Sequence, residues 1–159
     1  MRDSTLLTLS AEMNKWLTTT MNMTAGLQWR ERDASSEVFD TSEARIFANL
    51  DTELSKRDLV YTTLAYIDGD VVSSASPTLD IINAADAIEP DDAFGGIEAN
   101  QFAYRIDAET WVVTLGYNRA MSRSWSLDFS ARFVESESKK DSNIGYERQI
   151  LRASILGRF

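Results

Sequence analysis

The chain has 159 residues, the length of one domain, with 43% hydrophobic and 26% charged residues and a net charge of −9. It contains neither cysteine nor histidine, so disulfides, thiolate metal sites and the commonest general base are excluded. A pI near 4.5 argues against a nucleic-acid partner, because such binding requires lysine and arginine to neutralise phosphates. We therefore expect no enzyme activity, no cofactor, no metal and no nucleic acid.

Apolar and polar residues alternate with period two along nearly the whole chain. In residues 125–133, for example, one row is aromatic and aliphatic while the other holds serine, aspartate and arginine. No run approaches the roughly 18 consecutive apolar residues of a membrane-spanning helix. The pattern predicts seven antiparallel strands, at residues 5–13, 16–33, 42–55, 59–75, 102–121, 125–137 and 146–159.

Two of these strands carry irregular features. Asp68-Gly69-Asp70 could form a hairpin turn, but a continuous strand over residues 59–75 is the preferred interpretation. In residues 102–121 the apolar row changes parity near Glu109, which predicts a β-bulge.

The connections alternate in length. Tight turns are expected at residues 13–16, 54–59 and 121–125, and longer loops near 34–41, 76–101 and 138–145. Aromatic residues fall near the short-turn end and again 6–12 residues further along the strands, which predicts two aromatic belts. The belt at the short turns comprises Trp16, Tyr61, Tyr117, Trp125 and Phe159, and the other comprises Trp29, Trp111 and Phe133.

The longest loop, residues 76–101, is acidic. Ser76-Pro77 predicts a helix start, with serine as the N-cap and proline at the first helical position. The loop could bind Ca²⁺, constrict a pore, meet a partner, or form a solvated extracellular loop with a short helix on the rim. Its six acidic residues, with no basic one among them, are Asp80, Asp86, Glu89, Asp91, Asp92 and Glu98.

The final strand, Tyr146 to Phe159, ends in phenylalanine after apolar residues at alternate positions, namely Leu151, Ala153, Ile155 and Gly157. It resembles the C-terminal β-signal of Gram-negative outer-membrane β-barrel proteins. The resemblance implies an all-β, antiparallel, up-and-down transmembrane β-barrel over residues 1–159, integral to the outer-membrane lipid. It also implies recognition by the barrel-assembly machinery through Leu151, Ala153, Ile155 and Phe159.

The polar rows carry charges of both signs that would point into such a barrel. They could line an aqueous path, or pair across a filled lumen and serve stability alone. Asp68, Arg105, Asp107 and Glu109 are counted with these inward charges. The lumen-lining candidates are Arg30, Arg45, Asp51, Glu53, Asp128, Arg132, Arg148 and Arg152.

Seven strands would leave the sheet unclosed and the two chain ends on opposite sides of the membrane, whereas single-chain bacterial barrels have even strand numbers. We therefore expect the C-terminal part of a larger barrel, completed by upstream strands or other subunits. The chain also lacks a recognisable signal peptide after Met1.

The expected function is a porin-like pore or the membrane component of an envelope or export complex. The alternatives are a soluble lipocalin-like barrel that binds an apolar ligand, and a non-transporting scaffold for extracellular loops.

Overall fold

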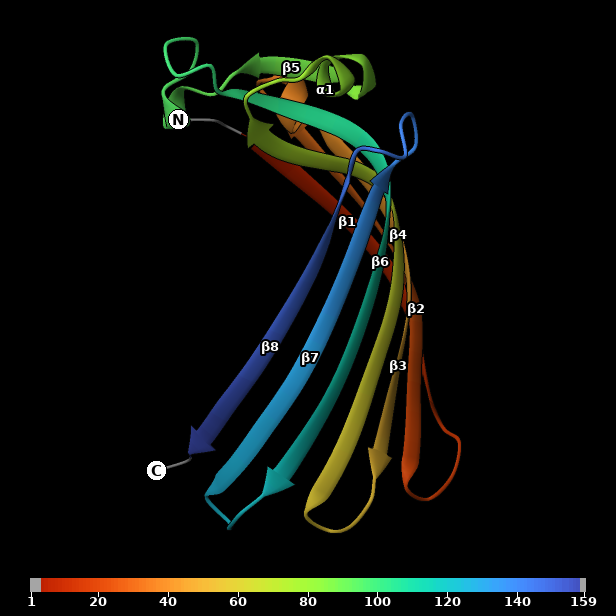
Figure 1. The fold of residues 1–159 in the computed structure, drawn as a ribbon. Helices are drawn as coiled ribbons and strands as arrows, with labels where there is room; N and C mark the ends of the chain where they lie inside the picture. The colour runs from red at the N-terminus through yellow and green to blue at the C-terminus, as the bar shows by residue number, and fades with distance from the viewer. Residues whose placement is uncertain (1–3, 158–159) are drawn as a thin grey trace.

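The computed structural model describes residues 4–157, which form one antiparallel sheet with short helical segments in its loops (Figure 1). The sheet has eight strands in the order β1-β2-β3-β4-β6-β7-β8, and β5 pairs with β6 outside this path. The predicted up-and-down order of the long strands is confirmed. The strands are β1 Ser4–Trp16, β2 Met21–Ala34, β3 Thr41–Glu53, β4 Asp58–Ala75, β5 Ala87–Pro90, β6 Phe102–Ala120, β7 Trp125–Ser138 and β8 Gly145–Gly157.

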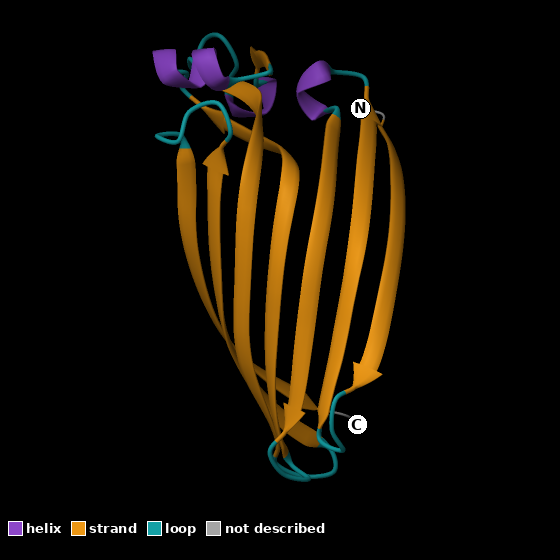
Figure 2. Cartoon of the chain, turned by 90° about the vertical axis from the view of Figure 1, so that its right-hand side faces the viewer, coloured by secondary structure: helices purple, strands orange, loops and turns teal. Residues whose placement is uncertain are grey.

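Helical structure is confined to the ends of the strands that carry the longer loops (Figure 2). The segments are the 3-10 helices η1, Glu37–Phe39, and η2, Asp92–Phe94, and the α-helix α1, Leu79–Ala84. Among residues 4–157, no helix is long and apolar enough to cross a membrane.

The sheet curves into an open trough and does not close into a barrel (Figures 1 and 2). β1 and β8 are its two edges, and no pairing joins them within the described residues. Both edge strands run from the long-loop end to the short-turn end (Figure 1). They are therefore parallel to one another, although every pair of neighbouring strands is antiparallel.

Three short turns of the same construction join strands at one end of the sheet. In each, the backbone N–H of the first turn residue, Leu17, Leu54 or Met121, donates to the carbonyl that opens the next strand, at 2.9 Å. A hydroxyl at the second position then accepts from the backbone N–H two residues later. The prediction that placed the first turn at residues 13–16 was wrong, because β1 continues to Trp16 and the turn occupies residues 17–20.

The ladders of β4 and β6 are continuous. β4 runs without a turn through Gly69, which pairs with Ala108, so the prediction of one long strand is confirmed. The predicted β-bulge near Glu109 was wrong, because β6 keeps one register with β4 and one with β7 on both sides of that residue. The change of apolar row therefore reflects a real exchange of the two faces, not an inserted residue.

The acidic loop at residues 76–101 contains the expected short helix, but begins it later. The N-cap of α1 is Thr78, whose hydroxyl accepts from the backbone N–H of Ile81. The prediction of Ser76 as cap was wrong. The short strand β5 was not predicted from the sequence.

Very few large side chains are buried. In the described part of the chain, Val38 of η1 is the largest one with less than 2% exposure, and the other buried hydrophobic residues include four alanines. Ile106 and Val112 of β6 complete this set. Within residues 4–157 the sheet thus has no dry core of aromatic and branched side chains behind either face.

Candidate functional site on the inner face

The two faces of the trough differ in chemistry. Tyr61 on β4 reaches across β6 to Asp128 on β7, at 3.1 and 3.2 Å from its two carboxylate oxygens. Along β6 and β7 the side chains on the face that holds this contact are less exposed than those of the opposite face, as expected on the concave side of a curved sheet. We therefore name the face that carries Asp128 the inner face, and the face that carries Phe129 the outer face.

The outer face is apolar and exposed along the lower and middle part of every long strand. On β8, Leu151 is 84% exposed and Ile155 is 69% exposed. These exposures are extreme for side chains whose burial is worth roughly 1.5–3 kcal/mol each. Large outer-face side chains on the other strands are 43–59% exposed, and they are Leu7, Leu9, Met13, Leu27, Ile46, Leu64, Trp111, Leu115, Trp125, Phe129 and Phe133.

The outer face changes abruptly from aromatic to acidic toward the loops. Tyr66 on β4 and Trp111 on β6 pair directly, with ring centroids 4.9 Å apart. The next outer positions on these strands are Asp68 and Glu109, which also pair directly. The same change from an aromatic to an acidic residue, two positions along the strand, occurs from Trp29 to Glu31 on β2 and from Phe133 to Glu135 on β7. We call this change the aromatic-to-acidic step.

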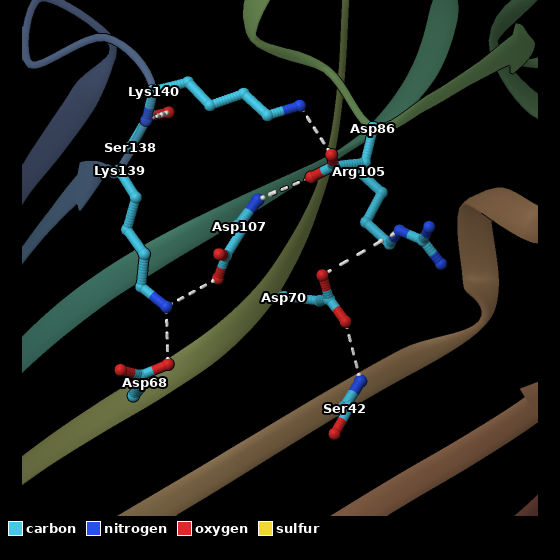
Figure 3. Close-up of polar contacts among 9 residues, drawn as sticks. All are labelled: Ser42, Asp68, Asp70, Asp86, Arg105, Asp107, Ser138, Lys139 and Lys140. Carbon is cyan, nitrogen blue, oxygen red and sulfur yellow. Dashed lines mark hydrogen bonds and ion pairs between the residues drawn. The ribbon is translucent and has the colours of Figure 1, made fainter.

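Charges that had been expected to point inward make an ion network on the outer face, beyond this step (Figure 3). The Lys139 ammonium lies 2.6 Å from Asp68 and 3.0 Å from Asp107, and Arg105 lies 3.8 Å from Asp70. The inward assignment of Asp68, Arg105, Asp107 and Glu109 was wrong. For the three residues of β6 it followed from the predicted β-bulge, whereas Asp68 lies on β4 in the same outer row as Tyr66. With a continuous ladder, odd-numbered residues of β6 stay on the outer face.

The network orders the loops around the sheet. Lys140 donates to Asp86 at 2.6 Å, and the backbone N–H of Asp107 also donates to that carboxylate. The Lys140 hydrogen bond, opposed by burial and supported by the Asp107 N–H, lowers the pKa of Asp86 below its ordinary value. The hydrogen bond from Lys139 to Asp68 raises the pKa of Lys139, and Asp107 adds to the effect.

All eight predicted lumen-lining charges lie on the inner face, as the strand registers require. They fall into two separate groups. One group is on β2 and β3, with Arg30, Arg45, Asp51 and Glu53, and the other is on β7 and β8, with Asp128, Arg132, Arg148 and Arg152.

In the first group, each of the two arginines contacts another side chain. Arg30 forms an ion pair with Glu43 at 3.1 Å, directly across the β2–β3 ladder. The Arg45 guanidinium lies 5.0 Å from the ring centre of Phe47, within cation–π range. Sequence reasoning missed Glu43 and Phe47, although both stand at the same parity as Arg45 and could have been found from it.

In the second group, the single carboxylate is held by neutral side chains. Asp128 accepts hydrogen bonds from Tyr61 and, at 3.4 Å, from Asn118. Tyr61 had been predicted in an aromatic belt facing outward, as had Trp16; the registers place both on the inner face. The Tyr61 ring lies over Gly116, where a Cβ atom would be 2.0 Å from Cζ of that ring.

Three of the four residues of the predicted assembly signal lie on β8, at the open edge of the sheet. Leu151, Ala153 and Ile155 share the outer face of β8, and Phe159 lies outside the described residues. Leu156 and Ile150 belong to the inner face of the same strand.

The inner face near the loops holds a small pocket. It has a volume of about 390 Å³ and is lined by Val71, Tyr104 and Ile106, with the hydroxyls of Ser136 and Ser138 on one side. Here the inner face is apolar, the reverse of its character lower down. Among the residues that the structure describes, no group of three or more carboxylates is placed to hold a metal ion.

No protein-family model, curated protein or solved structure matches this chain.

Proposed function

We propose that this chain forms part of the wall of an outer-membrane β-barrel, with the outer face against lipid and the inner face along an aqueous path. The single observation that carries the proposal is the broad, exposed apolar outer face opposite a charged inner face. Soluble monomers rarely expose a contiguous apolar patch larger than about 300–600 Å², whereas membrane barrels require one.

The height of the apolar band supports a membrane as its partner. On β7 the band runs from Trp125 to Phe133, and on β2 from Met21 to Trp29. Eight steps of strand span about 27 Å, which at a tilt of roughly 40° corresponds to about 21 Å along the membrane normal, close to the ~25 Å apolar band of outer-membrane barrels. Aromatic residues at the ends of the band occupy the positions that membrane interfaces favour.

The outer surface also offers a shape suited to lipid tails. A shallow groove of about 610 Å³ runs between Leu115, Tyr117, Phe129 and Leu151. Its lining on the outer face is almost entirely apolar. Such a groove accepts flexible acyl chains, although Ser130 and Arg152 also contribute to its lining.

The same distribution argues against a soluble lipocalin-like barrel. That architecture requires an apolar interior, but the middle of the inner face carries Arg30, Arg45, Asp128 and Arg132. The apolar pocket near the loops is small beside the exposed outer band.

The two open edges of the sheet must be paired if the sheet lies in a membrane. Unpaired backbone groups of β1 and β8 are costly in lipid, which is why membrane sheets close. Because the two edges are parallel, an all-antiparallel closure requires an odd number of additional strands. We propose that these come from a preceding part of the same protein or from other subunits.

Within that barrel, the polar inner face favours a passive pore or the membrane part of an envelope or export complex. A scaffold that only displays its loops would have the same outer face. Single-channel recordings of the reconstituted complete protein separate the two, since a scaffold with a filled lumen gives no conductance steps.

The membrane orientation can be tested with single cysteines, because the chain has none of its own. Phe129→Cys on the outer face and Ser130→Cys on the inner face are adjacent and form a matched pair. In reconstituted membranes, a water-soluble maleimide should label Ser130→Cys, and a lipid-soluble quencher should reach a probe on Phe129→Cys. Equal labelling of both positions by the water-soluble reagent would remove the proposal.

A further inference from the structure

Three arginines lie together on the inner face of the last two strands. Arg132 on β7 is directly opposite Ile150 on β8, so Arg148 and Arg152 are its two diagonal neighbours. Diagonal neighbours in an antiparallel sheet are separated by about 7–8 Å. All three side chains are exposed toward the trough.

This cluster has no carboxylate partner among the described residues. The other charged residue on the inner face of these strands is Asp128, a diagonal neighbour of Arg152. Its carboxylate accepts from Tyr61 and Asn118 and makes no ion pair within residues 4–157. The acidic residues Glu135 and Glu147 occupy the outer face of the same strands. Elsewhere in the sheet, by contrast, Arg30, Arg105 and Arg119 each have a carboxylate within 4 Å.

Three guanidinium groups held at this spacing repel one another, and an anion between them would relieve that repulsion. Their planar donor groups match the oxygen geometry of phosphate and carboxylate. Arg152 is already oriented, because its Nε donates to Ser154 Oγ at 3.1 Å and its two Nη groups make no hydrogen bond in the described structure.

We propose that Arg132, Arg148 and Arg152 form a binding site for a small solute that carries phosphate or carboxylate groups. The site rests on the proposed function, because a barrel lumen gives such a solute its route to the inner face. The net charge of −9 on the chain disfavours a long polyanion, and favours a small solute that contacts this cluster alone.

The site can be tested by titrating inorganic pyrophosphate, and separately citrate, into the full chain in zwitterionic detergent. Binding is measured by calorimetry and by ³¹P line broadening. The variant Arg132→Gln/Arg148→Gln/Arg152→Gln should bind at least roughly tenfold more weakly, since each charge-assisted pair contributes about a factor of ten. The control Arg32→Gln/Arg57→Gln/Arg123→Gln removes the same total charge away from the cluster and should bind as the unaltered protein does.

Equal affinity of the cluster variant and the unaltered protein would overturn the site, as would an equal loss in the control. A second variant, Arg132→Lys/Arg148→Lys/Arg152→Lys, keeps the charges and loses the forked donors. It should bind with an affinity between those of the unaltered protein and the glutamine variant. Circular dichroism of the strands verifies that each variant is folded.

Two further measurements distinguish the anion site from a lipid-headgroup site and from the membrane proposal. Competition by phosphatidylglycerol added to the micelles would identify a lipid headgroup as the source of phosphate, whereas a lumen site for free solutes is indifferent to it. Pyrophosphate binding by a protein that stays soluble without detergent would defeat the membrane proposal and leave the anion site standing. Membrane insertion without pyrophosphate or citrate binding would defeat the anion site and leave the membrane proposal standing.

Discussion

Tyr61 and Asp128 are joined by a hydrogen bond that crosses a whole strand. The phenol on β4 donates to the carboxylate on β7, over the backbone of β6 at Gly116. This contact links three strands on the inner face and satisfies a carboxylate that no arginine reaches among the described residues. It therefore ties the inner faces of β4 and β7 together across β6.

Replacing Tyr61 with phenylalanine should destabilise the protein by about 1–2 kcal/mol, because a hydrogen bond to a charged, half-buried group is lost while the ring stays. The measurement is urea unfolding in detergent. Tyr146→Phe is the matched control, since the Tyr146 hydroxyl forms no hydrogen bond within residues 4–157. Equal midpoints for both variants would show that the Tyr61 hydroxyl contributes nothing.

Gly116→Ala should be destabilising by about 1–3 kcal/mol, because the new methyl group would occupy the position of the Tyr61 ring. The strain should disappear when the ring is removed. In a double-mutant cycle with Tyr61→Ala, the two changes should therefore be strongly non-additive. Additive free energies of unfolding would contradict the contact.

The long strands could be predicted from alternation alone, because a sheet with one apolar and one polar face repeats every two residues. The first turn could not. Leu17-Thr18-Thr19-Thr20 continues the alternation of residues 16–33, and only comparison with Leu54-Ser55 and Met121-Ser122 identifies it as a turn. The shared signal is an apolar residue followed by a hydroxyl that caps the backbone two residues on.

The exchange of faces in β6 was misread for a physical reason. Sequence reasoning assumed that one row stays apolar along a strand, so Ile106 and Trp111 had to share a face and a bulge had to separate them. Pairing with β4 instead keeps Ile106 inward and Trp111 outward. A strand that leaves one environment for another can exchange its apolar face with no change in backbone.

The shared face of the inner charges follows from the alternation, but their pairing does not. Parity alone places Arg30 and Arg132 on the same face. The register between strands is needed to show that Arg30 forms an ion pair with Glu43, whereas Arg132 has two further arginines as diagonal neighbours. Register between strands depends on turn position, which alternation leaves undetermined.

Lys139 should give the protein an alkaline stability limit. Hydrogen bonds to Asp68 and Asp107 raise the pKa of Lys139 in the folded state. The resulting stabilisation is complete below the unfolded lysine pKa of about 10.4 and is lost as the pH rises above it toward the folded value. Stability measured from pH 8 to 11.5 should therefore fall more steeply for the unaltered protein than for Lys139→Gln. Lys56→Gln is the control, because Lys56 lies at a turn and makes no ion pair in the described structure. This variant should lose stability with rising pH as steeply as the unaltered protein does. Parallel stability curves for all three proteins would refute the role of Lys139.

Charge placed on the outer face should separate lipid from water as its surroundings. Leu64 on β4 is 46% exposed on the outer face, and the preceding residue, Thr63, pairs with Asn49 on the inner face. Against lipid, Leu64→Arg should cost about 2–4 kcal/mol near the middle of the band, whereas Thr63→Arg in an aqueous interior should cost less than about 1 kcal/mol. The two variants carry the same charge at adjacent positions, so a difference between them reports the surroundings of each face. Reversible unfolding from lipid vesicles measures both, and a larger cost for Thr63→Arg would place water outside the sheet and end the membrane interpretation.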